Sequence, residues 1–165
     1  ERIFCYCLAV LFFGGIFYYS HRARKKTIAS IPDEFKYIYV NIANFIAIDL
    51  RNQKMLLALD GTRKMYDFAD VQEYKRDTQE IKVYRKGRTS KRTKHYLILH
   101  VNDPENPTWG YSSPVKDEID CAELLVSRAL DGTLPDIDER RIIDDNLASV
   151  KKFMSFLSTG TGAQG

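Results

Sequence analysis

The sequence has little of what catalytic and metal-binding proteins usually contain. Its three cysteines cannot form a closed disulfide framework, and no two of them have the CxxC spacing of a zinc site. A Walker A sequence and an HExxH pair are both lacking. Residues 160–165 match the GxGxxG spacing, but they follow a predicted helix and have no βαβ context. We therefore predict no enzymatic activity, no metal site and no cofactor.

Histidine is also scarce, with three residues in the chain. His95 and His100 fall in one predicted strand, five residues apart. Because side chains alternate along a strand, these two imidazoles should lie on opposite faces and cannot meet at one metal. Cys121 and a histidine would form a nucleophilic pair, but Cys121 falls in a predicted helix beside Ala122, which favours a structural thiol.

Length and composition indicate a single folded domain. The chain has 165 residues, of which 44% are hydrophobic and 28% are charged, and such a length gives one domain of ordinary size. An aromatic share of 12% is too high for a disordered chain. The net charge of +3 is mild and does not by itself indicate a nucleic-acid partner, so we do not expect one.

A charge-free run occupies residues 3–19 and ends in Tyr18 and Tyr19. A bilayer core needs about 20 helical residues, with a lower limit near 17, and aromatic rings favour the headgroup level. We therefore predict a transmembrane anchor over residues 1–20 and a basic juxtamembrane linker over residues 21–34. The cations of this linker are Arg22, Arg24, Lys25 and Lys26.

The order of the apolar run and the cations predicts the location of the protein. By the positive-inside bias, cations after the run place the rest of the chain on the cytoplasmic side of the inner membrane, as a single-pass protein. A cleaved signal peptide would carry its cations before the run, and a buried core helix would show a polar stripe. Cys5 and Cys7 in this run are either palmitoylation sites or, as we favour, small packing residues.

The next hundred residues read as short strands followed by a helix. Asp60-Gly61 predicts a tight hairpin, because glycine accepts a positive φ. Apolar residues at helical spacing predict a helix from Val115 to Leu130. The predicted strands are residues 37–40, 45–50, 54–59, 63–68, 71–74, 81–84, 95–101 and 109–111. We predict an α+β fold, with a small antiparallel barrel or sandwich over residues 35–131 capped by this helix.

A hinge and a second helix should follow over residues 132–157, the helix beginning near Asp138, and residues 158–165 should form a disordered tail. Apolar residues of the second helix step by four and three along one narrow stripe. The stripe either packs on the domain core or forms a helix for a partner or for self-association. Its members are Ile143, Leu147, Val150, Met154 and Leu157.

The order of these elements resembles that of pleckstrin-homology-like (PH-like) and GRAM-like domains. The stretches that carry the resemblance are residues 45–57 (FIAIDLRNQKMLL) and 66–74 (YDFADVQEY). The resemblance implies a bacterial, membrane-anchored protein with a PH-like domain of unknown function. Family members that bind phosphoinositides carry Lys and Arg in the first hairpin of the barrel. Here that turn offers only Arg51 and Lys54, so specific inositol-phosphate recognition does not follow.

Charge is distributed unevenly along the chain. Residues 115–145 contain ten acidic and four basic residues, whereas residues 81–102 contain seven cations and no acid. These cations are Lys82, Arg85, Lys86, Arg88, Lys91, Arg92 and Lys94. They predict a long hairpin with a basic tip, which is either a contact for anionic lipid headgroups or an acidic protein or a solvated tip that aids solubility.

The function predicted from these features is that of a membrane-tethered cytoplasmic binding module. It would contact an unidentified protein partner or anionic lipid through the basic hairpin. The alternative is a structural subunit that assembles a membrane complex through the anchor and the second helix.

Overall fold

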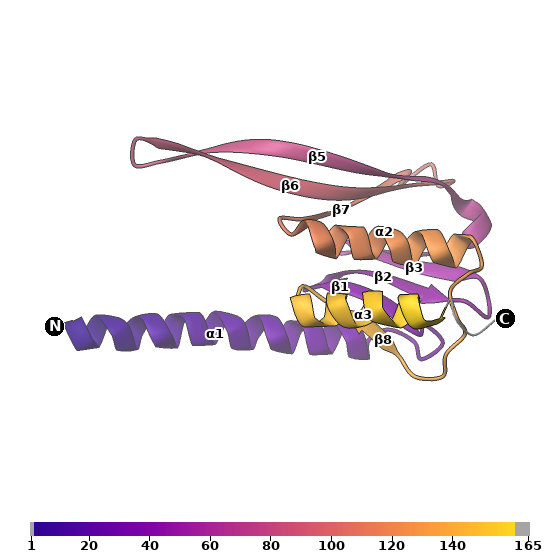
Figure 1. Cartoon of the computed structure of the whole chain (residues 1–165), viewed down its shortest axis with the longest axis horizontal. Coiled ribbons are helices and arrows are strands. Elements are labelled where there is room, and N and C mark those ends of the chain that lie inside the picture. Colours follow the sequence, from indigo (N-terminus) through magenta and orange to yellow (C-terminus); the bar gives the residue numbers. More distant parts are fainter. Residues whose placement is uncertain (1, 161–165) are drawn as a thin grey trace.

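The computed structural model describes the backbone of residues 2–160 and the side chains of residues 9–159. Over that range the chain is α+β, with two sheets and three α-helices (Figure 1). The helices are α1 (Arg2–Ala29), α2 (Lys116–Leu130) and α3 (Leu147–Gly160), with a 3₁₀ turn at Phe68–Asp70. The strands are β1 (Tyr37–Asn41), β2 (Asn44–Asp49), β3 (Lys54–Leu59), β4 (Thr62–Asp67), β5 (Val71–Arg85), β6 (Arg88–Val101), β7 (Thr108–Ser113) and β8 (Arg141–Ile143).

The first sheet has the strand order β4-β3-β2-β1-β8. Strands β1 to β4 form an antiparallel meander, and the turn between β3 and β4 is the predicted Asp60-Gly61 hairpin, with φ of 51° and 84°. Strand β8 adds to β1 in the parallel sense, with Tyr37 opposite Arg141. The last third of the chain thus returns to complete the sheet with which the domain begins.

The second sheet has the order β5-β6-β7 and packs on the first sheet through aromatic side chains. The Tyr111 hydroxyl donates a hydrogen bond to the Phe45 carbonyl at 2.9 Å. The rings of Tyr66 and Trp109 meet edge to face, with centroids 6.0 Å apart. Helix α2 packs against β6, β7 and α3 and adds Ile119 and Leu125 to the same core.

The opposite face of the first sheet is also covered. The C-terminal end of α1 and the turn after it place Ile28, Ile31 and Phe35 against Ile38 and Val40 of β1. Because the sheet is buried on both faces, β1 to β3 consist of almost unbroken apolar residues rather than strict alternation.

The structure corrects several predicted boundaries. Residues 71–74 and 81–84 belong to one strand, β5. Residues 141–143, predicted as helix, form β8, so α3 begins only at Leu147, and it includes residues 158–160 of the predicted disordered tail. The rest of that tail lies outside the described residues. The strands predicted to form a barrel or sandwich form two separate sheets and not one closed barrel.

The predicted transmembrane anchor is wrong. Among the residues that the structure describes, none of the helices combines the length and the apolar character needed to cross a bilayer. Helix α1 has 28 residues, but its charge-free part ends at Tyr19 and its C-terminal third carries the cations of the predicted linker, so the helix is not apolar along its length. The predicted single-pass inner-membrane localisation falls with the anchor, and the side chains of Cys5 and Cys7 lie outside the described ones.

Candidate anionic-partner interface

Strands β5 and β6 form a long hairpin that reaches well beyond the rest of its sheet (Figure 1). The two strands pair from Val71 and Val101 up to Arg85 and Arg88, with one register shift between Val71 and Glu73, whereas β7 pairs only with His95–His100 of β6. We call residues 79–94 the hairpin tip, and residues 71–78 with 95–101 the hairpin root. Over the tip, the second sheet narrows to a ribbon of two strands.

The turn of this hairpin has only two residues. Lys86 and Gly87 have φ of 46° and 74°, which are the positive values of a type I′ turn. Residues 85 and 88–92, predicted as the polar tip between two strands, belong to the strands themselves. The predicted long hairpin is confirmed, and its cations sit on a regular ladder that fixes the direction of each side chain.

Six of the seven cations of the tip are divided between the two faces of this ribbon, and Lys86 lies in the turn. Residues opposite one another in an antiparallel pair share a face, and faces alternate along each strand. Leu97 points into the core, so its partner Arg76 and the pair Lys82–Lys91 lie on the inner face. The outer face carries the larger group. Its members are Arg85, Arg88, Arg92 and Lys94.

Aliphatic residues lie among the cations of the outer face. Ile81 lies opposite Arg92 and is 42% exposed, and Val83 lies two residues further along β5. The Lys94 ammonium lies over the Tyr96 ring, 5.9 Å from its centroid. The outer face is therefore both basic and partly apolar.

Few of the tip cations are neutralised within the chain. Among residues 9–159, the tip has one ion pair, between Lys91 and Glu80 at 3.6 Å, and both side chains are about two-thirds exposed. That pair belongs to the inner face. The four cations of the outer face have no carboxylate within ion-pair distance in the part of the chain that is described, so their charge faces solvent.

The hairpin root, in contrast, is anchored to α2 by a charged cluster. Arg76 donates hydrogen bonds to Asp120 and, at 3.0 Å, to Glu123. Burial alone would raise the pKa of Asp120, but the hydrogen bonds from Lys116 and Arg76 outweigh it and hold that pKa below its usual value. The root thus fixes the direction in which the tip projects.

The basic residues of the predicted linker do not join the hairpin. They lie on α1, at the opposite side of the molecule from β5 and β6 (Figure 1). Arg24 is largely buried and pairs with Asp144 at 3.1 Å and with Asp145. Among the described side chains of α1, the exposed Lys and Arg residues are Arg22, Lys25 and Lys26.

The stripe of the predicted partner helix is divided by the structure. Ile143 lies in β8, and Val150 and Leu157 lie in the core with at most 3% exposure. Leu147 and Met154 are 47% and 43% exposed. Most of the stripe therefore packs inward, and assembly through this helix stays a prediction.

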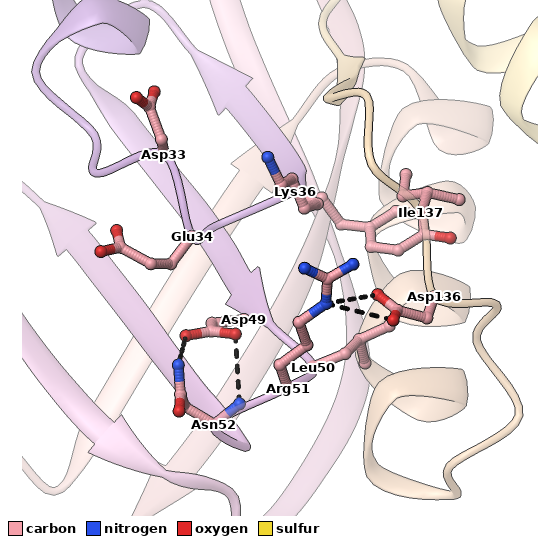
Figure 2. Close-up of a pocket in the computed structure, with 10 residues that line it drawn as sticks. Asp33, Glu34, Lys36, Asp49, Leu50, Arg51, Asn52, Asp136 and Ile137 are labelled. Carbon is pink, nitrogen blue, oxygen red and sulfur yellow. Dashed lines mark hydrogen bonds and ion pairs between the residues drawn. The ribbon is translucent and has the colours of Figure 1, made fainter.

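A pocket of about 280 Å³ lies beside the turn between β2 and β3 (Figure 2). The Arg51 guanidinium in its lining donates to Asp136 at 3.1 Å and to Asp138, which lies outside the lining, at 3.0 Å. The Asp49 carboxylate accepts from the backbone N–H and the side-chain amide of Asn52, at 3.2 and 2.7 Å, which closes the turn.

This pocket includes the position where the PH-like resemblance would place a headgroup site. Of the two cations in that turn, Arg51 is paired as described and Lys54 pairs with Asp67 at 3.0 Å. The partners of Arg51 could not be predicted from local sequence patterns, because Asp136 and Asp138 lie more than 80 residues away. Both cations therefore already have carboxylate partners within the chain.

The remaining candidate for chemistry is Cys121, which is buried in α2. Burial raises the pKa of its thiol to about 12, so the sulfur stays protonated at neutral pH and is a poor nucleophile. In the described part of the chain, no group of three or more His, Cys, Asp or Glu side chains is placed to hold a metal ion.

Comparison with known proteins gives no relative. No family model, no curated protein and no solved structure matches the chain. The resemblance to PH-like domains and the bacterial origin that it implies stay predictions.

Proposed function

We propose that this protein is a non-enzymatic binding module that contacts an acidic protein partner through the basic tip of its β5–β6 hairpin. The observation that carries the proposal is the outer face of the tip. Four cations on one face of a projecting ribbon form a field of a single sign, which attracts acidic partners and guides their encounter.

The apolar content of the outer face favours a protein over a nucleic acid. Ile81 and Val83 lie among the cations, and Tyr96 supports Lys94. A partner that presents carboxylates and small apolar groups would match both kinds of side chain, whereas a phosphate backbone would use only the charge. Anionic lipid is the competing partner, and the test below includes it.

The experiment measures the binding of fluorescein-labelled poly-glutamate to the full chain over a salt series, with poly-glutamine as the neutral probe. The test variant replaces Arg85, Arg88, Arg92 and Lys94 by Ser. The control variant replaces four exposed lysines outside the hairpin, Lys25, Lys26, Lys151 and Lys152, and so has the same net charge.

We expect poly-glutamate binding that weakens as salt rises, a loss of about tenfold or more in the test variant, and a loss of less than about threefold in the control. Equal losses in both variants would show that only net charge matters and would contradict the proposal. Binding to phosphatidylserine vesicles without binding to poly-glutamate would identify a lipid surface instead and would also overturn it.

A further inference from the structure

Part of β6 has an unused backbone edge. Strand β6 pairs with β5 along its full length, but on its other side β7 reaches only from His100 to His95. In the region that the structure describes, Arg88–Lys94 therefore has a strand on one side alone. This segment is exposed along most of its length.

The backbone groups on that edge can be assigned from a contact at the other end of β6. The Val101 N–H donates to the Pro107 carbonyl at 3.0 Å, on the side of β7. In an antiparallel ladder, backbone groups alternate between the two sides of a strand. The N–H groups of Thr93, Lys91 and Thr89 therefore point to the same side, beyond the end of β7.

The turn supports the same assignment independently. In a two-residue hairpin, the residues that close the turn bond to each other, so the backbone groups of Arg85 and Arg88 face inward. Counting on from Arg88, every odd residue of β6 faces outward. Three outward N–H groups at alternate positions make an edge that a further strand could extend.

The charge of this edge restricts what can bind there. Residues 88–94 include four cations and no acid, and a strand added beside them would place its side chains next to these cations. The same edge of a second copy would oppose cation with cation, which is destabilising. The acidic segment of this chain is engaged elsewhere, because Asp136 and Asp138 pair with Arg51.

We propose that Arg88–Lys94 of β6 binds an extended acidic peptide segment, which adds as a strand in line with β7. The inference rests on the proposed function and specifies how the partner is held. Backbone hydrogen bonds to Thr89, Lys91 and Thr93 would provide affinity, and the cations on both faces would select acidic side chains.

The test uses two synthetic peptides and two variants of the full chain. One peptide has four Glu-Val repeats, and the other has the same composition with D-valine, so that it keeps the charge but cannot form a regular strand. Thr93→Pro removes an outward N–H and places the proline ring on the docking edge, while the ladder with β5 keeps its inward groups. Thr93→Val, which keeps the N–H, is the matched control.

We expect the all-L peptide to bind at least tenfold more tightly than the D-valine peptide. Its binding should slow hydrogen exchange at Thr89, Lys91 and Thr93, and Thr93→Pro should weaken it at least tenfold while Thr93→Val leaves it unchanged. Equal binding of the two peptides, with Thr93→Pro as effective as the unaltered chain, would overturn strand addition and leave the charge-based function standing. Failure of both peptides to bind at low salt would overturn the two proposals together.

Discussion

The hairpin root and the hairpin tip share one ladder but have opposite surroundings. In the root, Leu97 and Leu99 are fully buried against the core, and Arg76 is held by α2. In the tip, Ile81 and Tyr84 are 42% and 76% exposed. The register is unbroken between the two, so strand pairing continues where burial ends. Buried apolar residues hold the root in place. The tip needs only strand pairing, so its side chains are available to carry charge.

The largest effect that should separate the two regions comes from truncating a buried side chain. We expect Leu97→Ala in the root to lower the free energy of unfolding by about 2–5 kcal/mol, because it leaves a cavity in the core. Val83→Ala in the tip should change it by no more than about 0.5 kcal/mol. Urea unfolding followed by the fluorescence of the single tryptophan, the buried Trp109, measures both. Equal losses would show that the tip belongs to the cooperative core.

The charged anchor of the root should give the next largest effect. Arg76→Gln removes the cation that Asp120 and Glu123 share, and we expect a loss of about 1 kcal/mol. Lys82→Gln, on the inner face of the tip, is the matched change without a carboxylate partner, and it should leave the urea midpoint unaltered. If neither substitution lowers the urea midpoint, apolar packing alone holds the root in place.

The contact between Tyr66 and Asp103, next to the hairpin root, should make the stability of the fold depend on pH. The Tyr66 hydroxyl donates to Asp103 at 2.6 Å, and this bond, together with Lys64, lowers the pKa of Asp103 to about 2. A depressed carboxyl pKa stabilises the fold above its ordinary value near 3.8, and this stabilisation is lost as the pH falls to about 2. Asp103→Asn should therefore reduce the drop in urea midpoint between pH 4 and pH 2. An identical drop in the unaltered chain and in Asp103→Asn would show that these contacts of Asp103 do not stabilise the fold.

The smallest effect on global stability should come from the turn of the tip. Gly87 has a φ of 74°, which alanine adopts at a cost of about 1 kcal/mol. We expect Gly87→Ala to speed amide exchange across the tip, because the strain opens the ribbon locally. The free energy of unfolding measured in urea should not change by more than about 0.5 kcal/mol. A large shift of the midpoint would mean that tip and root unfold together.

The elements that could be predicted from the sequence are those in which burial imposes a regular pattern of apolar residues. The strands of the first sheet and the Asp60-Gly61 turn follow from apolar runs and from glycine, and α2 follows from its helical spacing. Residues 75–80 are all polar, with no apolar alternation along the strand, so the single strand β5 was predicted as two. The three residues of β8 are too few to show the alternation of a strand, and they were predicted as part of the following helix.

The candidate site was predicted in composition but not in geometry. All seven cations could be read from the sequence, whereas their division between two faces depends on the register of β5 against β6. The error over α1 arose because the charge-free run was judged apart from the basic residues that continue the same helix. The partners of Arg51 depend on long-range contacts, which local patterns do not contain.

The parallel pairing of β8 with β1 has a consequence for how the chain folds. Tyr37 and Arg141, which lie opposite one another, are separated by most of the domain, so closing this contact costs more loop entropy than any hairpin of the meander. During synthesis, the edge of β1 stays open until residue 143 has left the ribosome. A nascent or truncated chain that ends before β8 would expose an apolar strand edge, which makes this species the one most prone to aggregate.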